Sequence, residues 1–251
     1  MRPFFTCLLL SFSFFACNEK NGAGSGFSTE PLDTIQWRPA KVDAKPVLFE
    51  EAFIKGTTKK INNSTVSLNG ITIGKIKIAS GLIIACDPMH IDEYGIPFTQ
   101  IFPNGDFPVQ LSITKVNAEE TIAFARISFS EEPVAKWEFA LQKGQLPIPP
   151  GGEKMHGYSV DAGVGIFIDK DASKALGQEH VTNMDTGIYK EMDKHRHYDW
   201  RYTMYNFGAH NLAAFSTGFG DGYFVTYIGF DANGTPCRLL TDFNVIDWKK
   251  K

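Results

Sequence analysis

Short apolar runs separated by turn residues are the feature that most restricts how this chain can fold. Residues 71–78 (ITIGKIKI) alternate apolar and polar side chains, which is the period of a half-buried β-strand. Comparable runs lie at 82–86, 107–116, 121–129, 134–141, 156–161, 164–168, 212–216, 223–230 and 236–243. The sequence DANG at 231–234 predicts a hairpin, because Asn-Gly accommodates positive φ. We therefore predict a mainly β protein (α+β by strict count), an antiparallel β sandwich or barrel-like sheet.

Helical periodicity is sparse, so we expect two or three short helices. The candidates are residues 46–55, 171–176 and 188–195. The loop at 147–152 (PIPPGG) has sheet-like sequence on both sides, so we interpret it as internal. Residues 31–251 are predicted to form a single β-rich domain.

The amino-terminal sequence MRPFFTCLLLSFSFFACNEK resembles a bacterial lipoprotein signal peptide. Its apolar stretch, residues 4–15, is too short to span a bilayer as a helix. The resemblance implies cleavage after Ala16, removal of residues 1–16 and lipidation of Cys17. Asn18, where an Asp would indicate inner-membrane retention, favours the outer membrane of a Gram-negative bacterium. The alternative is a buried amphipathic start in which Ala-Cys occurs by chance.

Composition and charge restrict the partners. Residues 17–30 are rich in Gly and Ser and predict a flexible tether behind the lipidated cysteine. With 43% hydrophobic residues the chain can build a core, which excludes a disordered protein. Lys plus Arg number 25 against 28 Asp plus Glu, so nothing indicates a nucleic-acid partner. We expect membrane attachment through Cys17 and a protein or glycan partner in the cell envelope.

Six segments resemble, in order, the bacterial domain-of-unknown-function family catalogued as number 4241. They are GLIIACDPM (81–89), PFTQIFPNGDFPVQLSI (97–113), ARISFSEEPVAKWEFAL (125–141), YSVDAGVGIFID (158–169), NLAAFSTGFGDGYFVTYIGFDANG (211–234) and CRLLTDF (237–243). The resemblance covers about residues 70–248. It implies no activity, cofactor or site residue.

Aspartates at strand ends are the weak candidates for catalysis. They are Asp87, Asp161, Asp221 and Asp242, with His90 close to the first in sequence. If they converge in a cleft, they could perform acid/base chemistry or hold a hard cation. The alternative, which we favour for each Asp taken singly, is turn formation through hydrogen bonds to nearby backbone N–H groups. We predict no cofactor and leave a divalent metal open.

The glycine-rich segment 216–223 is the second candidate site. Gly220 could let a ligand approach the backbone, and Phe219 and Tyr223 are the aromatics most suited to exposure and carbohydrate stacking. The segment lacks the Lys-Ser/Thr end of a P-loop, so nucleotide binding is not expected. A tight turn or bulge is the simpler interpretation.

The remaining candidates are cysteines and histidines. Cys86 and Cys237 could form a disulfide in an oxidising compartment, but we favour two buried thiols. A nucleophile built on Cys86 has little support. His195 and His197 could form a zinc pair if extended, but a solvated face is favoured, so no metal site is predicted.

Two functions follow from these observations. The first is a lipid-anchored binding or interaction module of the cell envelope, favoured because the chain contains no complete catalytic motif. The second is an envelope hydrolase of glycan or ester bonds that uses Asp161 and Asp221, with Asp87, Asp242 or a divalent ion. A third hypothesis is a purely structural envelope protein, which differs from the first only in lacking a partner.

Overall fold

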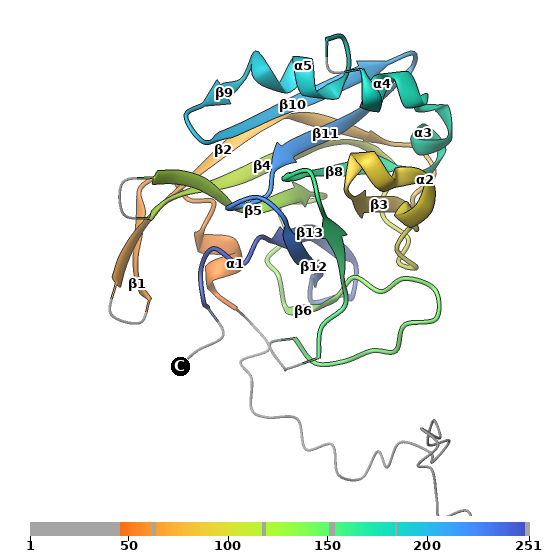
Figure 1. Cartoon of the computed structure of the whole chain (residues 1–251). Coiled ribbons are helices and arrows are strands. Elements are labelled where there is room, and N and C mark those ends of the chain that lie inside the picture. The colour runs from red at the N-terminus through yellow and green to blue at the C-terminus, as the bar shows by residue number, and fades with distance from the viewer. Residues whose placement is uncertain (1–45, 62–63, 117–118, 151–153, 184, 249–251) are drawn as a thin grey trace, which may run out of the picture. The chain divides into compact units, whose positions relative to one another are not determined.

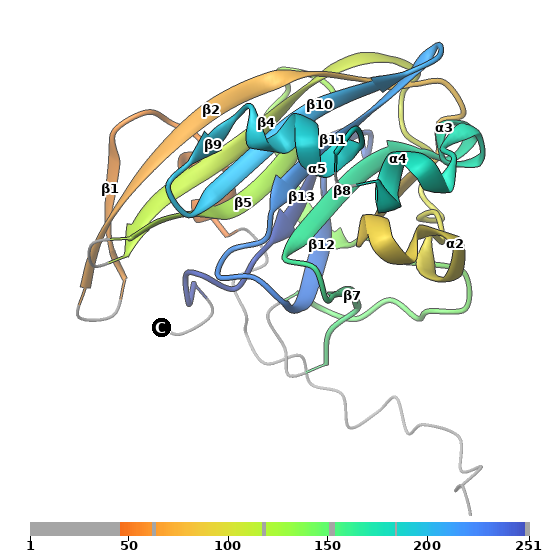
Figure 2. The same ribbon diagram turned by 45° about the horizontal axis from the view of Figure 1, so that its top comes forward.

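The computed structural model describes residues 46–61, 64–116, 119–150, 154–183 and 185–248, and two antiparallel sheets dominate them (Figures 1 and 2). The first sheet has the order β1-β2-β4-β5-β13-β12-β6, and β7 also pairs with β12. Its strands are β1 (Thr57–Ile61), β2 (Ser64–Ile78), β4 (Gly105–Val116), β5 (Glu119–Ser128), β6 (Lys136–Phe139), β7 (Gly157–Val160), β12 (Gly222–Phe230) and β13 (Pro236–Asp242).

The second sheet has the order β3-β8-β11-β10-β9, again antiparallel throughout. Its strands are β3 (Ile83–Cys86), β8 (Val164–Asp169), β9 (Arg196–His197), β10 (Trp200–Phe207) and β11 (His210–Ser216). The predicted antiparallel, mainly β architecture is thus confirmed.

Short helices cover the outer faces of both sheets. They are α1 (Leu48–Glu51), α2 (Ile91–Tyr94), α3 (Lys170–Ala175), α4 (Gln178–Thr182) and α5 (Ile188–Asp193), with a 3₁₀ turn, η1 (Pro88–His90), before α2. Figures 1 and 2 place α3, α4 and α5 over the second sheet, whereas α1 lies beside the first. The three predicted helices correspond to α1, α3 and α5; α1 and α5 are shorter than predicted, and α3 begins and ends one residue earlier.

Apolar side chains fill three layers. The largest cluster lies between the sheets and includes Ile76, Leu111, Phe167, Phe215 and Leu239. A second joins the outer face of the second sheet to α2–α5, and a third packs Phe49 and Phe53 of the α1 region against the outer face of the first sheet. The second sheet is therefore buried on both faces, so its strands need not alternate apolar and polar residues.

Strand β10 shows this effect most clearly. Trp200 packs in the cluster between the sheets, whereas Tyr205 and Phe207 pack in the cluster beneath the helices. Both faces of the strand are therefore apolar, and its sequence, WRYTMYNF, has no period of two. For this reason our sequence prediction contained no strand here, and it also missed β1 and β9.

A bulge bends the longest strand, β2. The pairing of β2 with β4 shifts register between Thr72 and Gly74, and Gly74 has a φ of 149°. A Cβ at Gly74 would lie 2.6 Å from Cγ of Met204 in β10. Glycine at the bulge therefore allows close contact between the two sheets.

Candidate functional site

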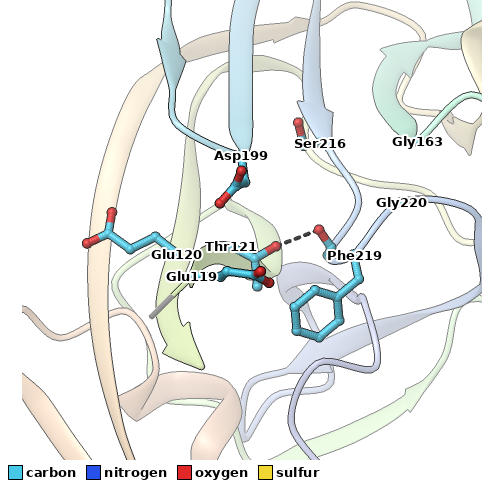
Figure 3. Close-up of a pocket in the computed structure, with 9 residues that line it drawn as sticks. Glu119, Glu120, Thr121, Gly163, Asp199, Ser216, Phe219 and Gly220 are labelled. Atoms are coloured by element: carbon cyan, nitrogen blue, oxygen red, sulfur yellow. Dashed lines mark hydrogen bonds between the residues drawn. The ribbon is translucent and has the colours of Figure 1, made fainter. Parts of the chain in front are cut away.

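A pocket of about 300 Å³ opens where the start of β5, the β9–β10 hairpin and the loop after β11 meet (Figure 3). Both sheets contribute to its wall. Its volume is at the lower end of the range typical of small-molecule sites. The pocket is lined by Glu119, Glu120, Thr121, Gly163, Asp199, Ser216, Gly218, Phe219 and Gly220.

The loop between β11 and β12 forms one wall of the pocket and is closed by its own hydrogen bonds. The Gly220 N–H donates to the Thr217 carbonyl (2.9 Å), and the Thr217 hydroxyl donates to the Gly220 carbonyl (2.8 Å). The Thr121 hydroxyl of β5 donates to the Gly218 carbonyl (2.5 Å), as Figure 3 shows. Gly218 and Gly220 have φ values of 55° and 117°, so the path of this loop depends on glycine at both positions.

Phe219 lies between these two glycines and is 65% exposed. Its ring extends from the loop at the side of the pocket (Figure 3). Tyr223, at the start of β12, is 45% exposed but does not line the pocket. The exposure expected for both aromatics is therefore found, and Phe219 offers a flat apolar face to a ligand.

The polar lining of the pocket is acidic. Glu119, Glu120 and Asp199 each carry a carboxylate, and none of the nine lining residues is Lys, Arg or His. Figure 3 shows the Asp199 carboxylate on the side facing Thr121, whereas Glu120 extends away. Ionised carboxylates only accept hydrogen bonds. The pocket therefore suits a ligand that donates hydrogen bonds and presents an apolar face to Phe219.

Asp87, the first predicted catalytic candidate, is buried and acts in a turn. One carboxylate oxygen accepts the N–H of Met89 (2.8 Å) and thereby caps η1. The other accepts the N–H groups of Asp161 (2.8 Å) and Ala162 (3.1 Å) in the β7–β8 turn. These three bonds tie together two loops that are more than seventy residues apart in sequence.

Three further candidates lie around that junction. The exposed Asp161 carboxylate forms an ion pair with Nε2 of His90 (3.4 Å). A Cβ at Gly163 would lie 3.5 Å from Cα of Gly220 and 4.0 Å from a carboxylate oxygen of Asp221. The structure thus brings the loops of Asp87, Asp161 and Asp221 to one end of the sheets, but none of these aspartates lines the pocket.

Asp242 is the fourth predicted aspartate, and it too serves the backbone and its neighbours. It is buried at the end of β13, where it accepts the Asn244 N–H (2.9 Å) and the Trp248 indole N–H (2.6 Å). Sequence reasoning overlooked Asp169, a buried carboxylate that caps α3 and also accepts two N–H groups and a hydroxyl from Ala79 and Ser80.

Cys86 and Cys237 are free, buried thiols in different sheets, so the disulfide that the sequence left open is not formed. Burial, with a smaller contribution from Asp87, raises the pKa of the Cys86 thiol far above its usual value. Burial likewise raises the pKa of Cys237. Since the thiolate is the nucleophile, neither residue is suited to nucleophilic catalysis.

The two histidines of the candidate zinc pair stack on aromatic side chains. His195 stacks on Tyr202 (centroids 5.0 Å apart), and His197 stacks on Trp200 (4.5 Å). Within the described residues, no group of three or more His, Cys, Asp or Glu side chains is arranged to hold a metal ion.

Of the residues that line the pocket, the sequence candidates include only those of the glycine-rich segment 216–223, with Phe219 and Gly220 named singly. Glu119 and Glu120 belong to a polar stretch that predicts a hairpin turn, and Asp199 lies in a hairpin that the sequence did not reveal. They line one pocket because the two sheets pack against each other, which brings the start of β5 close to the β9–β10 hairpin. No local pattern could have indicated this.

The predicted lipidation residue Cys17, the signal peptide 1–16 and the tether 17–30 lie outside the described residues. In the described part of the chain, no helix has the length and apolar character needed to cross a membrane.

Comparison with known proteins identifies the family. A family model described as a protein of unknown function (DUF4241) matches residues 76–241, which is more than half of the chain. The match runs from the end of β2 to β13 and includes every residue that lines the pocket. No curated protein and no solved structure matches the chain. The chain belongs to the DUF4241 family of proteins of unknown function.

Proposed function

We propose that this protein is a lipid-anchored binding module of the cell envelope that holds a carbohydrate in the pocket beside Phe219. The observation that carries the proposal is the combination, in one pocket of about 300 Å³, of an exposed aromatic ring with carboxylates. Sugar rings have an apolar face of C–H groups and an edge of hydroxyl donors. Phe219 matches the face, and Glu119 and Asp199 match the hydroxyls.

The loop geometry supports a binding surface that is formed before the ligand arrives. Thr121 and Thr217 hold the Phe219 loop through side-chain hydrogen bonds, so little ordering is needed on binding. A ring that is already exposed and fixed costs little to bring into contact with a ligand.

The same geometry gives less support to the alternative hypothesis, an envelope hydrolase, than to a binding role. The carboxylates of Asp87 and Asp242 are buried and accept two or three hydrogen bonds each, which leaves them poorly placed to exchange protons with a substrate. Asp161, His90 and Asp221 are more accessible, but they lie outside the pocket lining. A binding role therefore accounts for more of the site.

The proposal includes a lipid anchor that would hold the binding module at the membrane. Lipidation of Cys17 in the outer membrane and a tether over residues 17–30 would present the pocket to envelope glycans. Attachment would also raise the effective concentration of a weak binding site near its ligand.

Affinity measurements on the full chain in detergent test this function. Cellobiose, maltose and chitobiose are titrated by calorimetry into the wild type, Phe219→Ala and Asp199→Asn. At least one disaccharide should bind, and each substitution should weaken binding about tenfold or more, because stacking contributes up to about 1.5 kcal/mol and a hydrogen bond to a charged group about 1.5–3 kcal/mol. Leu146→Ala is the matched control, since Leu146 is 68% exposed and does not line the pocket.

Two results would overturn the proposal. One is that no disaccharide binds to the wild type. The other is that a diamine such as putrescine binds through Asp199 while all three sugars fail, since this would assign the carboxylates to a cation.

A further inference from the structure

One residue of the β9–β10 hairpin has a backbone conformation that its side chain disfavours. His197 pairs with Trp200, so only Tyr198 and Asp199 connect the two strands. Tyr198 has a φ of 45°. In two-residue hairpin loops this left-handed region is normally taken by Gly, Asn or Asp, because the Cβ of other residues approaches a carbonyl oxygen.

The rest of the described chain follows that preference. Ten glycines have positive φ, and the other non-glycine residue with positive φ in the described ranges is Asn244, at 55°. Asparagine is among the residue types that tolerate this region best. Within the described residues, Tyr198 is therefore the only bulky side chain held in this conformation.

Packing does not explain the choice of tyrosine, because Tyr198 is 89% exposed. The hairpin itself is fixed by other groups. His197 stacks on Trp200 with an angle of 14° between the rings, and Trp200 is buried in the cluster between the sheets. A strained residue that gains no burial is typical of functional surfaces, where the strain is tolerated for the sake of contact with a ligand.

The place of Tyr198 in the chain connects it with the pocket. The next residue, Asp199, lines the pocket, and Phe219 lines it from the loop after β11. We propose that Tyr198 is a specificity-determining residue of the same site, and that its ring stacks on the sugar unit next to the one held against Phe219. This inference rests on the proposed carbohydrate function. It predicts a preference for oligosaccharides longer than the pocket can enclose.

Substitution of Tyr198 separates strain from binding. In Tyr198→Asn the backbone conformation becomes favourable, so the melting temperature should rise by about 2–4 °C. The affinity for the tetrasaccharide of the sugar that binds (cellotetraose, maltotetraose or chitotetraose) should fall at least fivefold. The affinity for the corresponding disaccharide should change less than twofold. Tyr198→Phe keeps the ring and the strain, so it should match the wild type in both measurements.

The matched control is Tyr94→Asn, the same change at a tyrosine that is 58% exposed in α2. It should produce neither the rise in melting temperature nor the loss of tetrasaccharide binding.

The outcomes distinguish this inference from the proposed function. If the wild type binds none of the sugars, both fail. If the wild type and Tyr198→Asn bind the tetrasaccharide equally, the role of Tyr198 is wrong and the pocket assignment stands. A lower melting temperature for Tyr198→Asn would contradict the strain on which the inference depends.

Discussion

The carboxylate of Asp87 accepts the backbone N–H of Asp161 at 2.8 Å, so one predicted catalytic residue positions the loop that carries another. Asp161 in turn forms an ion pair with His90, two residues after the 3₁₀ turn begins. The loops of Asp87, Asp161 and Asp221 thus lie together, and the buried Asp87 carboxylate holds two of them through hydrogen bonds to the backbone.

Removal of the Asp87 carboxylate should destabilise the fold. Asp87→Ala leaves the N–H groups of Met89, Asp161 and Ala162 without their acceptor, and hydrogen bonds to a charged group contribute about 1.5–3 kcal/mol each. We expect urea denaturation to show a loss of at least about 3 kcal/mol. Asp221→Ala, at an exposed position of the neighbouring loop, should stay within about 0.5 kcal/mol. Equal losses in the two variants would contradict this account.

Contact between β2 and the backbone that follows α1 should make Gly70 intolerant of a side chain. A Cβ at Gly70 would lie 1.9 Å from the carbonyl oxygen of Phe53, a backbone atom that cannot rotate away. We expect Gly70→Ala to cost about 3 kcal/mol in the free energy of unfolding. Gly208→Ala is the control, because it meets no atom within 4 Å and only its φ of 54° opposes the change, at about 1 kcal/mol. A Gly70→Ala protein as stable as Gly208→Ala would show that the backbone at Phe53 does not lie against β2.

Both cysteines of the described region should be unreactive in the folded protein. Burial raises the pKa of Cys86 and of Cys237, so little thiolate is present at pH 8. Peptide mapping after iodoacetamide treatment should find both unmodified without urea and modified with it. Recovery of a cross-linked Cys86–Cys237 peptide from non-reduced protein would contradict the free thiols.

Tyr189, a buried tyrosine of α5, should contribute to alkaline unfolding. Burial, with a smaller contribution from Asp87, raises the pKa of Tyr189 to about 12. The folded protein therefore keeps a proton that the unfolded chain releases near pH 10, and this stabilisation is present below pH 10 and is lost between pH 10 and 12. Tyr189→Phe should reduce the slope of unfolding free energy in that window by up to about 1.4 kcal/mol per pH unit.

At pH 7, Tyr189→Phe should be nearly neutral, because the Tyr189 hydroxyl has no hydrogen-bond partner among the described residues. Tyr94→Phe, at an exposed tyrosine, serves as the control. Urea titrations at several values between pH 7 and 11 measure both effects, and an unchanged alkaline slope in Tyr189→Phe would refute the assignment.

More of the fold than of the candidate site could be predicted from the sequence. Alternation at 71–78 and the Asn-Gly turn at 233–234 predicted antiparallel strands, because one face of each strand meets the core and turn chemistry is local. Strand β10 was not predicted because Trp200 and Tyr205 pack on opposite faces of it, which removes the alternation of apolar and polar residues. Phe219 was predicted from its flanking glycines. Glu119 and Asp199 could not be predicted, since they belong to different sheets and line one pocket only because the two sheets pack together.

Mapping of sugar contacts by two-dimensional ¹H–¹⁵N NMR is the most direct test of the central claim. Labelled full-length protein in detergent is titrated with cellobiose, maltose and chitobiose. For the sugar that binds, we expect amide shifts to concentrate at 119–121, 199 and 216–220, and Phe219→Ala to need about tenfold more sugar to reach the same shifts. Shifts that instead centre on His90, Asp161 and Asp221, or an absence of shifts with all three sugars, would contradict the claim.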